Sequence, residues 1–300
     1  MGVKKSKGGK KKMTVSRIGV IGGTGLYDFP DLEIKEEIAI KTPFGDPSDK
    51  YILAVLEGRE VVFLPRHGKG HRILPTELNF RANIWGMKSL GVERIIALSA
   101  VGSLKEDIHP GDFVIIDQFF DRTKRRISTF FGDGIAVHVH FADPVCPELA
   151  DILYESAKAI GKNVHKGGTY VCMEGPQFST RAESNFYRML GASVIGMTNL
   201  QEAKLSREAE ICYATVALVT DYDCWHETEE DVSVEAILKV LKENADSARA
   251  MVREALKKIP EKRENCSCRD ALKNCIVTDP NLIPEETKEK LSLIIKKYIK

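Results

Sequence analysis

Short apolar runs alternate with amphipathic stretches along most of the chain. Runs rich in β-branched residues that end at a turn residue predict buried strands, whereas apolar positions spaced three or four apart predict helices. The run at 213–220 is almost wholly apolar or small, so we expect it at the centre of a sheet. The expected strands are 17–21, 61–64, 94–99, 113–116, 166–173 and 213–220, and the expected helices are 75–90, 147–160, 233–256 and 284–299.

This mixture of strands and helices, without an internal repeat, predicts an α/β fold: a single domain with a mixed central β-sheet covered by helices. The chain has 300 residues, of which 43% are hydrophobic, and this is enough for one large core. We interpret residues 1–14 as a flexible Lys-rich tail and residues 15–300 as the domain. Its polar, cysteine-bearing segment 261–280 leads to a C-terminal helical extension.

Charge and hydropathy restrict the partners. The 44 basic and 43 acidic residues nearly cancel, so we expect no global field that attracts nucleic acid. The six lysines within residues 1–12 are the exception, and loose polyanion binding is the alternative to a plain tail. No apolar run is long enough to span a membrane, and no signal-peptide core follows the lysines. We therefore predict a cytoplasmic protein without nucleic-acid or membrane partners.

Two turns after predicted strands carry groups that bind anions. In the glycine-rich turn 22–25, backbone N–H groups can converge on a phosphate, and Thr24 adds a hydroxyl. A plain tight turn and a dinucleotide site are the alternatives, although the third glycine of a dinucleotide fingerprint is missing. Arg66 and His67 follow the strand 61–64, and the planar guanidinium of an arginine can hold phosphate bidentately. A solvated surface pair is the alternative there.

The segment Thr-Asp-Tyr-Asp at 220–223 follows the apolar run 213–220. If the chain stays extended, Asp221 and Asp223 point to the same side, and two close carboxylates cannot both ionise easily. One acid then keeps its proton near neutral pH and can donate a hydrogen bond, while the other accepts one. A solvated acidic turn is the alternative.

Taken together, five segments resemble the methylthioadenosine phosphorylase branch of the purine-nucleoside phosphorylases: GGTG at 22–25, PRHG at 65–68, EGPQFSTRAES at 174–184, MT at 197–198 and TDYD at 220–223. The resemblance extends from about residue 17 to residue 256. It implies phosphorolysis of 5′-methylthioadenosine to adenine and 5-methylthioribose 1-phosphate, with inorganic phosphate as co-substrate and no cofactor. The alternatives are an inosine and guanosine phosphorylase, a nicotinamide-dependent oxidoreductase, and a nucleotide-binding module without catalysis.

The same resemblance assigns roles to individual residues and implies a homo-oligomer, either a trimer or a hexamer. His138 matches a histidine that the neighbouring subunit lends to the site. Asp221 and Asp223 are the expected catalytic acids. The expected phosphate-binding residues are Thr24, Arg66, His67, Ser99, Ala100 and Thr198, and the expected nucleoside-binding residues are Phe178, Ser179, Met197, Val234, Ile237 and His138.

The seven cysteines do not suit a secreted disulfide scaffold, because their number is odd. We interpret most of them as reduced structural thiols; the alternative is one or two intracellular disulfides, with Cys146–Cys212 and Cys266–Cys268 as possible pairs. Cys266-Ser-Cys268 with Cys275 lacks the paired spacing of a structural zinc site, and His138-Val-His140 has no evident third ligand. The sequence therefore predicts no metal site.

Overall fold

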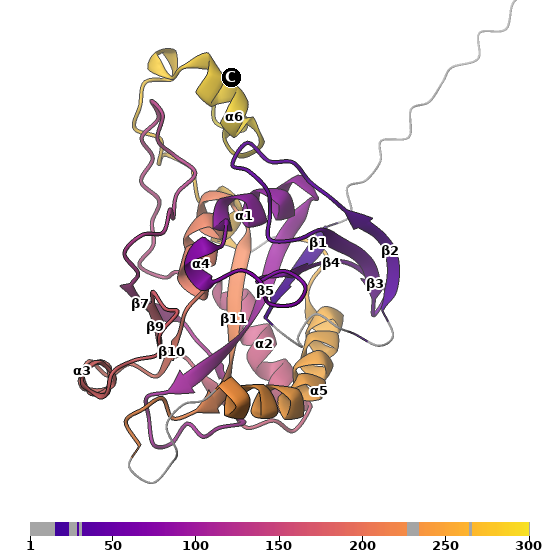
Figure 1. Cartoon of the computed structure of the whole chain (residues 1–300). Coiled ribbons are helices and arrows are strands. Elements are labelled where there is room, and N and C mark those ends of the chain that lie inside the picture. The colour runs from indigo at the N-terminus through magenta and orange to yellow at the C-terminus, as the bar shows by residue number, and fades with distance from the viewer. Residues whose placement is uncertain (1–15, 24–28, 30–31, 227–233, 264–265, 300) are drawn as a thin grey trace, which may run out of the picture.

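The computed structural model describes residues 16–23, 29, 32–226, 234–263 and 266–299. The whole predicted Lys-rich tail, residues 1–14, and Thr24 lie outside these ranges. Within them a mixed sheet runs through the molecule, with helices on both faces (Figure 1). The predicted α/β fold, with a mixed central sheet covered by helices, is confirmed. None of the described helices is long and apolar enough to cross a bilayer.

The strands of the sheet follow one another in the chain as β1 (Arg17–Gly22), β2 (Glu33–Ile38), β3 (Tyr51–Leu56), β4 (Arg59–Pro65), β5 (Val92–Ser103), β6 (Phe113–Ile115), β7 (Gln118–Arg122), β8 (Val164–Lys166), β9 (Thr169–Met173), β10 (Val194–Gly196) and β11 (Cys212–Asp221). The helices are α1 (Phe80–Ser89), α2 (Pro147–Ala159), α3 (Arg181–Met189), α4 (Asn199–Glu208), α5 (Val234–Lys258) and α6 (Glu285–Ile295), with short 3₁₀ turns η1 (Pro75–Glu77), η2 (Ser267–Asp270) and η3 (Pro280–Leu282).

Strand β5 lies at the centre of the sheet and pairs with three other strands. β11 pairs with it in parallel over nearly its whole length, as the apolar run at 213–220 predicts. On the opposite edge, β1 pairs in parallel with β5 only as far as Leu98, and β10 pairs antiparallel with Gly102 and Ser103. Residues 99–101 of β5 therefore have no strand partner on that edge, and the sheet opens there.

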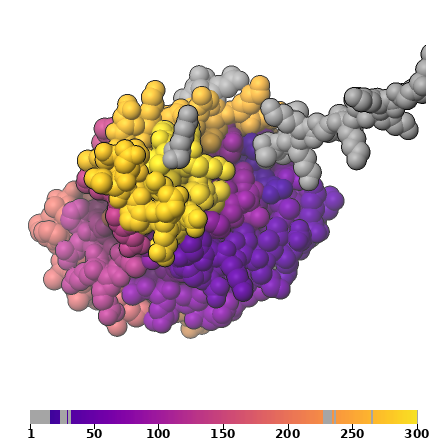
Figure 2. All heavy atoms as spheres, turned by 90° about the horizontal axis from the view of Figure 1, so that it is seen from above, coloured from indigo at the N-terminus to yellow at the C-terminus, as the bar shows by residue number. Residues whose placement is uncertain are grey.

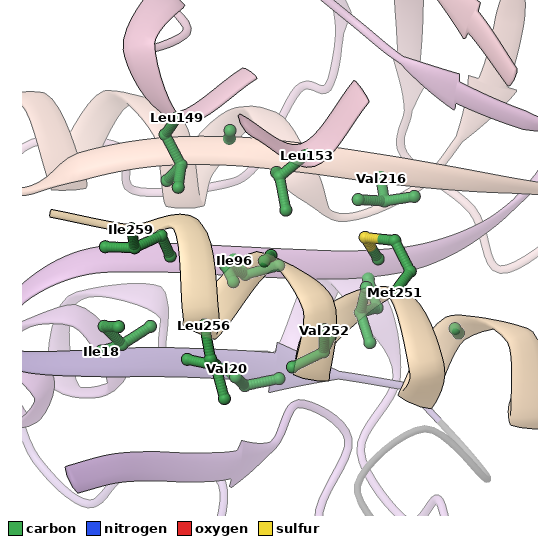
Figure 3. Packing of buried hydrophobic residues seen from close by; sticks show 14 of the residues in the cluster. Ile18, Val20, Ile96, Leu149, Leu153, Val216, Met251, Val252, Leu256 and Ile259 are labelled. Carbon is green, nitrogen blue, oxygen red and sulfur yellow. The ribbon is translucent and has the colours of Figure 1, made fainter. Parts of the chain in front are cut away.

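Alternating side chains of the central strands divide the interior into two cores. Ile96 and Leu98 of β5 pack with α2 and α5 on one face, whereas Ile95 and Ala97 pack with α1 and α4 on the other. Figure 3 shows the first core, in which Leu149 and Leu153 of α2 and Met251 and Leu256 of α5 belong to one buried cluster with residues of the central strands. This is the period of two expected for strands buried on both faces.

The C-terminal segment joins the second core. Leu291, Ile294 and Ile295 of α6 pack with residues of α1 and α4, and Figure 2 shows the C-terminal residues, in yellow, seated against the rest of the molecule. Helix α6 is therefore packed against the helices that cover this face of the sheet.

Two predicted elements differ from the structure. The helix expected at 75–90 starts at Phe80, because Asn79 caps α1 by accepting a hydrogen bond from the Ala82 N–H at 3.1 Å, and residues 75–77 form only η1. The strand expected at 166–173 is divided into β8 and β9 by Gly167 and Gly168, whose φ angles of 82° and 129° do not fit a strand.

Helix α1 contacts β3 through a glycine, and this contact can be tested. A Cβ at Gly86 would lie 2.2 Å from the Tyr51 hydroxyl oxygen and 2.5 Å from its ring, inside a fully buried contact. We expect Gly86→Ala to lower the free energy of unfolding by about 1–3 kcal/mol, because the ring must move within a packed core. Denaturant unfolding of the two proteins measures it.

The control is Gly91→Asn, at a helix-end glycine with a φ of 76° and open space around a built Cβ. Asparagine tolerates this backbone conformation, so we expect a cost below about 1 kcal/mol. Equal losses in the two variants would show that the contact with Tyr51 is not what requires glycine at position 86.

Candidate active site

The open edge of β5 forms one wall of a cavity of about 610 Å³. Its lining comes from segments far apart in the sequence: the ends of β4, β5 and β11, the β10–α4 junction, and the first turns of α5. Strand ends that converge at an opening of the sheet are the usual ligand site of α/β folds. The predicted site residues that line this cavity are Arg66, His67, Ser99, Ala100, Phe178, Met197, Thr198, Asp221, Asp223, Val234 and Ile237.

Three predicted site residues are not part of the lining. Thr24 lies outside the described residues, although its neighbour Gly23 lines the cavity. Ser179 is half-buried behind Asp223, and His138 is exposed and belongs to no wall of the cavity in the single chain.

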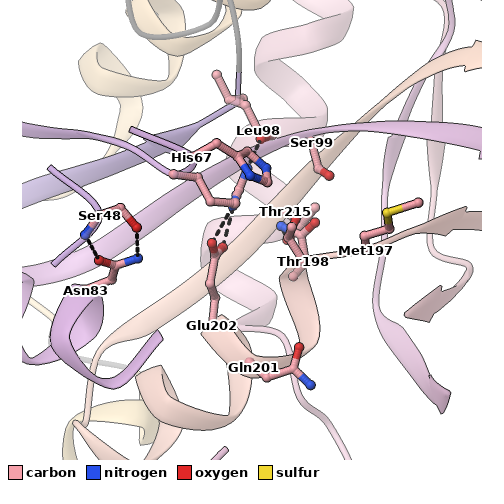
Figure 4. Close-up of polar contacts among 12 residues, drawn as sticks. Ser48, His67, Asn83, Leu98, Ser99, Met197, Thr198, Gln201, Glu202 and Thr215 are labelled. Atoms are coloured by element: carbon pink, nitrogen blue, oxygen red, sulfur yellow. Dashed lines mark hydrogen bonds and ion pairs between the residues drawn. The ribbon is translucent and has the colours of Figure 1, made fainter. Parts of the chain in front are cut away.

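Arg66 is buried and held by a carboxylate that the sequence analysis did not identify. Its Nε donates to Glu202 Oε1 at 2.5 Å and its Nη2 to Oε2 at 3.1 Å, while Nη1 donates to the Leu98 carbonyl at 3.0 Å (Figure 4). Glu202 lies on α4 and also accepts from the Tyr213 hydroxyl at 2.8 Å. These bonds fix the plane of the guanidinium and leave two of its five N–H groups for a ligand.

His67 is held by a backbone carbonyl through one of its ring nitrogens. Its Nδ1 lies 2.8 Å from the Ile73 carbonyl oxygen, which can only accept, so the proton sits on Nδ1 and Nε2 carries a lone pair. Burial, and then the neighbouring Arg66 charge, lower the pKa of His67 to about 4. At neutral pH His67 is thus a neutral ring whose remaining nitrogen accepts a hydrogen bond, and it is stacked on His71 at 4.3 Å.

The N-terminus of α4 opens into the cavity at Thr198. Thr198 occupies the cap position, but its hydroxyl makes no capping bond with the helix backbone, so it remains available to a ligand. Helix N-termini attract anions through unpaired N–H groups and the helix dipole. Figure 4 shows Ser99 and Thr198 on the same side of the open strand edge, next to Met197.

Tyr170, which the sequence analysis did not identify, packs against the junction between β10 and α4. Its hydroxyl accepts from the Thr198 N–H at 3.5 Å, and a Cβ at Gly196 would lie 2.0 Å from the same hydroxyl. The buried phenol therefore requires glycine at position 196.

The acid pair at the end of β11 is brought together by a turn. Asp221 Oδ2 accepts from the Thr220 hydroxyl at 2.6 Å, and Oδ1 accepts from the Asp223 N–H at 2.8 Å. The expected extended conformation ends at Asp221, because Asp223 has a φ of 50°. Gly102 makes room for this turn, since a Cβ there would lie 2.8 Å from Asp221 Oδ1.

Both carboxyl groups hold their protons more strongly than usual. Burial raises the pKa of Asp221 from 3.8 to about 6, and repulsion from Asp223 is only a secondary cause. Burial also raises the pKa of Asp223, against the effect of the hydroxyls of Ser184 and Ser179. Asp223 Oδ2 is buried and has no hydrogen-bond partner among the described residues, so an acceptor at the cavity wall remains unsatisfied.

The remaining walls are apolar. Val234, Ile237, Leu238 and Leu241 line the cavity from one face of α5, and Phe178 lies opposite in a loop before α3. Arg126, another residue that the sequence analysis did not identify, fixes this side: its guanidinium donates to the Met197, Met173 and Glu174 carbonyls. A motif search could not have found Arg126, because its partners lie 47 to 71 residues away in the chain.

All seven cysteines are free thiols in the structure, so neither possible disulfide is present. The residues of both pairs, Cys146, Cys212, Cys266 and Cys268, nevertheless lie in one buried cluster. The sequence analysis did not predict this gathering, because Cys146 and Cys212 lie 120 and 54 residues from Cys266.

The raised pKa of Asp221 has a consequence for stability. A carboxyl group with a folded pKa of about 6 and an ordinary value of 3.8 destabilises the fold when ionised, at pH values above 6, and has no such effect below 3.8. We expect Asp221→Asn to raise the free energy of unfolding by up to about 3 kcal/mol at pH 8 and by about half as much at pH 5.

Denaturant unfolding at the two pH values measures this difference. Asp246→Asn, at an exposed carboxylate of α5, is the control and should show no comparable gain at either pH. A gain for Asp221→Asn that is the same at pH 5 and pH 8 would contradict the raised pKa.

Comparison with known proteins agrees with this geometry. A profile of the Phosphorylase superfamily matches residues 17–257. A protein of Geobacter sulfurreducens named S-methyl-5′-thioadenosine phosphorylase is 59% identical over 283 residues, covering 94% of this chain and 99% of its own. One from Koribacter versatilis with the same name is 60% identical, covering 94% of this chain and 97% of its own.

Solved structures show the same relationship. A methylthioadenosine phosphorylase from an antarctic soil metagenomic library superposes with a TM-score of 0.88 at 48% identity, covering 93% of this chain and 99% of its own. A methylthioadenosine phosphorylase from Schistosoma mansoni in complex with adenine has a TM-score of 0.79 at 34% identity, covering 94% of this chain and 98% of its own. The chain described here belongs to the phosphorylase superfamily.

Proposed function

We propose that this chain is an S-methyl-5′-thioadenosine phosphorylase that converts 5′-methylthioadenosine and phosphate to adenine and 5-methylthioribose 1-phosphate, in purine and methionine salvage. The observation that carries the proposal is that one cavity holds anion-binding groups at one end and a buried pair of raised-pKa acids at another, with an apolar wall on α5. The curated relatives of 48–60% identity bear this name.

Phosphate binds at the open edge of β5. Arg66 supplies the N–H groups that Glu202 and Leu98 leave free, and Ser99, Thr198 and the N-terminus of α4 add neutral donors. Glu202 cancels the formal charge of Arg66, so the site attracts phosphate through directed hydrogen bonds rather than through net charge. His67 takes part as an acceptor, and a phosphate that carries a proton satisfies its Nε2.

Adenine binds at the acid pair. Protonated Asp221 donates to N7, and the unpartnered Asp223 oxygen accepts from the 6-amino group. A 6-oxo purine would place its O6 against that oxygen, which is repulsive while Asp223 is ionised, so the pair favours adenine over hypoxanthine or guanine. Phe178 contacts the base from the loop before α3, and Ser179 lies behind Asp223.

The sugar and its 5′ group lie between these two ends. Met197 contacts the ribose face, where a thioether suits an apolar surface. Val234 and Ile237 project from α5 into the cavity, and burying a methylthio group there contributes roughly 1–2 kcal/mol. A 5′-hydroxyl would gain nothing from these side chains.

The chemistry requires no protein nucleophile. As the bond between C1′ and the purine nitrogen lengthens, positive charge builds on the ribose, and the phosphate held below C1′ stabilises it and attacks. The electron pair of the broken bond passes to the base, and Asp221 neutralises the developing charge by hydrogen bonding or proton donation at N7. Burial of Asp221 keeps its pKa near the working pH, as general acid catalysis requires.

We further propose that the active form is a cytoplasmic homo-oligomer, a trimer or a hexamer, in which His138 enters the site of the next subunit. His138 is exposed in the single chain, and the side chains of Phe186, Met189 and Leu190 around α3 are 44%, 79% and 52% exposed. Apolar side chains gathered on a surface favour burial against another subunit. The seven free thiols suit a reducing compartment.

A substrate panel tests the function directly. Methylthioadenosine, adenosine, inosine and guanosine are each incubated with and without phosphate, and the free base is measured. We expect adenine release from methylthioadenosine to depend on phosphate and to exceed release from inosine by at least about 100-fold in kcat/KM, because a buried mismatched polar pair costs about 3 kcal/mol. Equal release without phosphate would contradict phosphorolysis and indicate a hydrolase.

The acid pair has its own test. We expect Asp223→Asn to lower kcat/KM for methylthioadenosine about 10-fold to 100-fold and to leave inosine turnover unchanged or higher, because the amide can donate to O6. Asp246→Asn is the matched surface control and should change neither. If Asp223→Asn reduced both substrates alike, Asp223 would not determine the choice of base.

A further inference from the structure

Four cysteine thiols from three distant segments meet at the edge of the first core. Cys146 precedes α2 at its cap position, Cys212 is the first residue of β11, and Cys266 and Cys268 belong to the η2 turn. All four are at most 8% exposed. Their four sulfur atoms lie within 4.8 Å of one another, with Cys212–Cys266 at 3.2 Å and Cys146–Cys266 at 3.6 Å.

The cluster has the size of a tetrahedral thiolate site. A Zn–S bond of about 2.3 Å gives sulfur–sulfur edges of about 3.8 Å, which fall within the range of separations observed here. Small rotamer changes would therefore bring all four sulfurs onto one ion. Cys275, although close in sequence and buried, is not part of the group and directs its thiol at the Ala271 carbonyl at 3.2 Å.

The surroundings provide positive charge for a thiolate cluster. Arg263 Nη1 lies 4.0 Å from Cys212 Sγ while donating to the Glu210 carbonyl, and its Nε lies 3.5 Å from Glu93. Arg94 is the direct neighbour of Cys212 in the β5–β11 register and is 1% exposed. Its Nη2 donates to the Lys262 carbonyl, and its Nη1 has no hydrogen-bond partner among the described residues.

Arg94 is not neutralised by a described carboxylate, which is unusual for an arginine buried this deeply. Four thiolates around a divalent cation carry a net charge of −2, and a buried arginine on the same sheet face stabilises that charge. The unpartnered Nη1 of Arg94 and the thiol cluster are thus two separate observations, and both favour negative charge at this end of β5 and β11.

We propose that Cys146, Cys212, Cys266 and Cys268 bind one Zn²⁺ ion in a closed structural site. Four thiolates select zinc or iron among the common metals, and a buried set of four ligands leaves no position for a reacting molecule. Cys146 at the start of α2 and Cys212 of β11 lie within the part of the chain that the superfamily profile matches, residues 17–257. Cys266 and Cys268 lie beyond it. The ion therefore fastens the C-terminal segment to the catalytic core.

Metal content of the full-length protein is the first test. The protein is purified without chelators under reducing conditions, and its zinc and iron are measured by inductively coupled plasma mass spectrometry. We expect about one zinc per chain, with the four cluster cysteines protected from alkylation until a strong chelator is added. Half-exposed Cys224 should react from the start.

Two matched variants locate the ion. Cys266→Ser should reduce the zinc content to below about one tenth per chain and lower the midpoint of thermal unfolding, whereas Cys275→Ser should retain the zinc. Cys266→His supplies another zinc ligand and should recover part of the binding. If Cys266→Ser does not fold, release of one zinc per chain from the wild-type protein, with four newly reactive cysteines, decides the matter.

Other results would overturn the proposal. If the wild-type protein contained no metal and had two disulfides after rapid alkylation, the four cysteines would form two disulfide bonds instead of a metal site. One iron per chain with a coloured ferric thiolate spectrum would replace zinc by iron, and no metal with four free thiols would leave only core packing. None of these results depends on phosphorolysis, so the metal proposal and the proposed function fail separately.

Discussion

The active-site architecture depends on the buried ion pair between Arg66 and Glu202. The pair joins the end of β4 to α4, and its further bonds reach the Leu98 carbonyl of β5 and the Tyr213 hydroxyl of β11. Desolvating two charges is costly, and the cost is offset here because three N–H groups of Arg66 and both carboxylate oxygens of Glu202 are hydrogen-bonded. Loss of either member would leave an uncompensated charge inside the sheet, which typically costs 3–5 kcal/mol. The same pair determines which two N–H groups of the arginine face the cavity, and so it couples folding to ligand recognition.

Where the sheet opens is set by β5. Its unpaired edge at residues 99–101 results from the exchange of β1 for β10 as neighbour. Backbone groups that lose their strand partner need other partners, and a ligand can supply them. Ser99 at the open edge, Arg66 at the end of β4 and Thr198 at the start of α4 are therefore brought to one place by the strand topology, although 132 residues separate the last two.

Local patterns predicted the elements well where a single strand or helix decides the outcome. The apolar run of β11, the helix at α2 and the Pro-Arg-His turn after β4 could all be recognised in the sequence. The site residues were assigned from the family resemblance, and eleven of the fourteen line the cavity. Glu202, Arg126 and Tyr170 could not be recognised, because a glutamate, an arginine or a tyrosine has no local signature until a distant segment folds against it.

The helix at α1 was predicted to start too early, because Pro75 is also a helix-starting signal and competes with the actual cap at Asn79. The cysteine cluster was missed for a related reason: ligand spacing identifies sites built from one hairpin or turn, and this cluster draws on three segments.

Helix α5 extends from the wall of the cavity into the first core. Its 25 residues span about 37 Å, and its burial changes from one end to the other: Val234 is 63% exposed, Leu241 is 8% exposed, and Met251, Val252 and Leu256 are fully buried. The C-terminal half of α5 is therefore packed in the core, whereas the N-terminal turn that lines the cavity is largely exposed. Under the proposed function, the wall that faces the 5′ group is therefore the least buried part of α5, whereas the groups proposed to select the base lie on β11 and the turn after it.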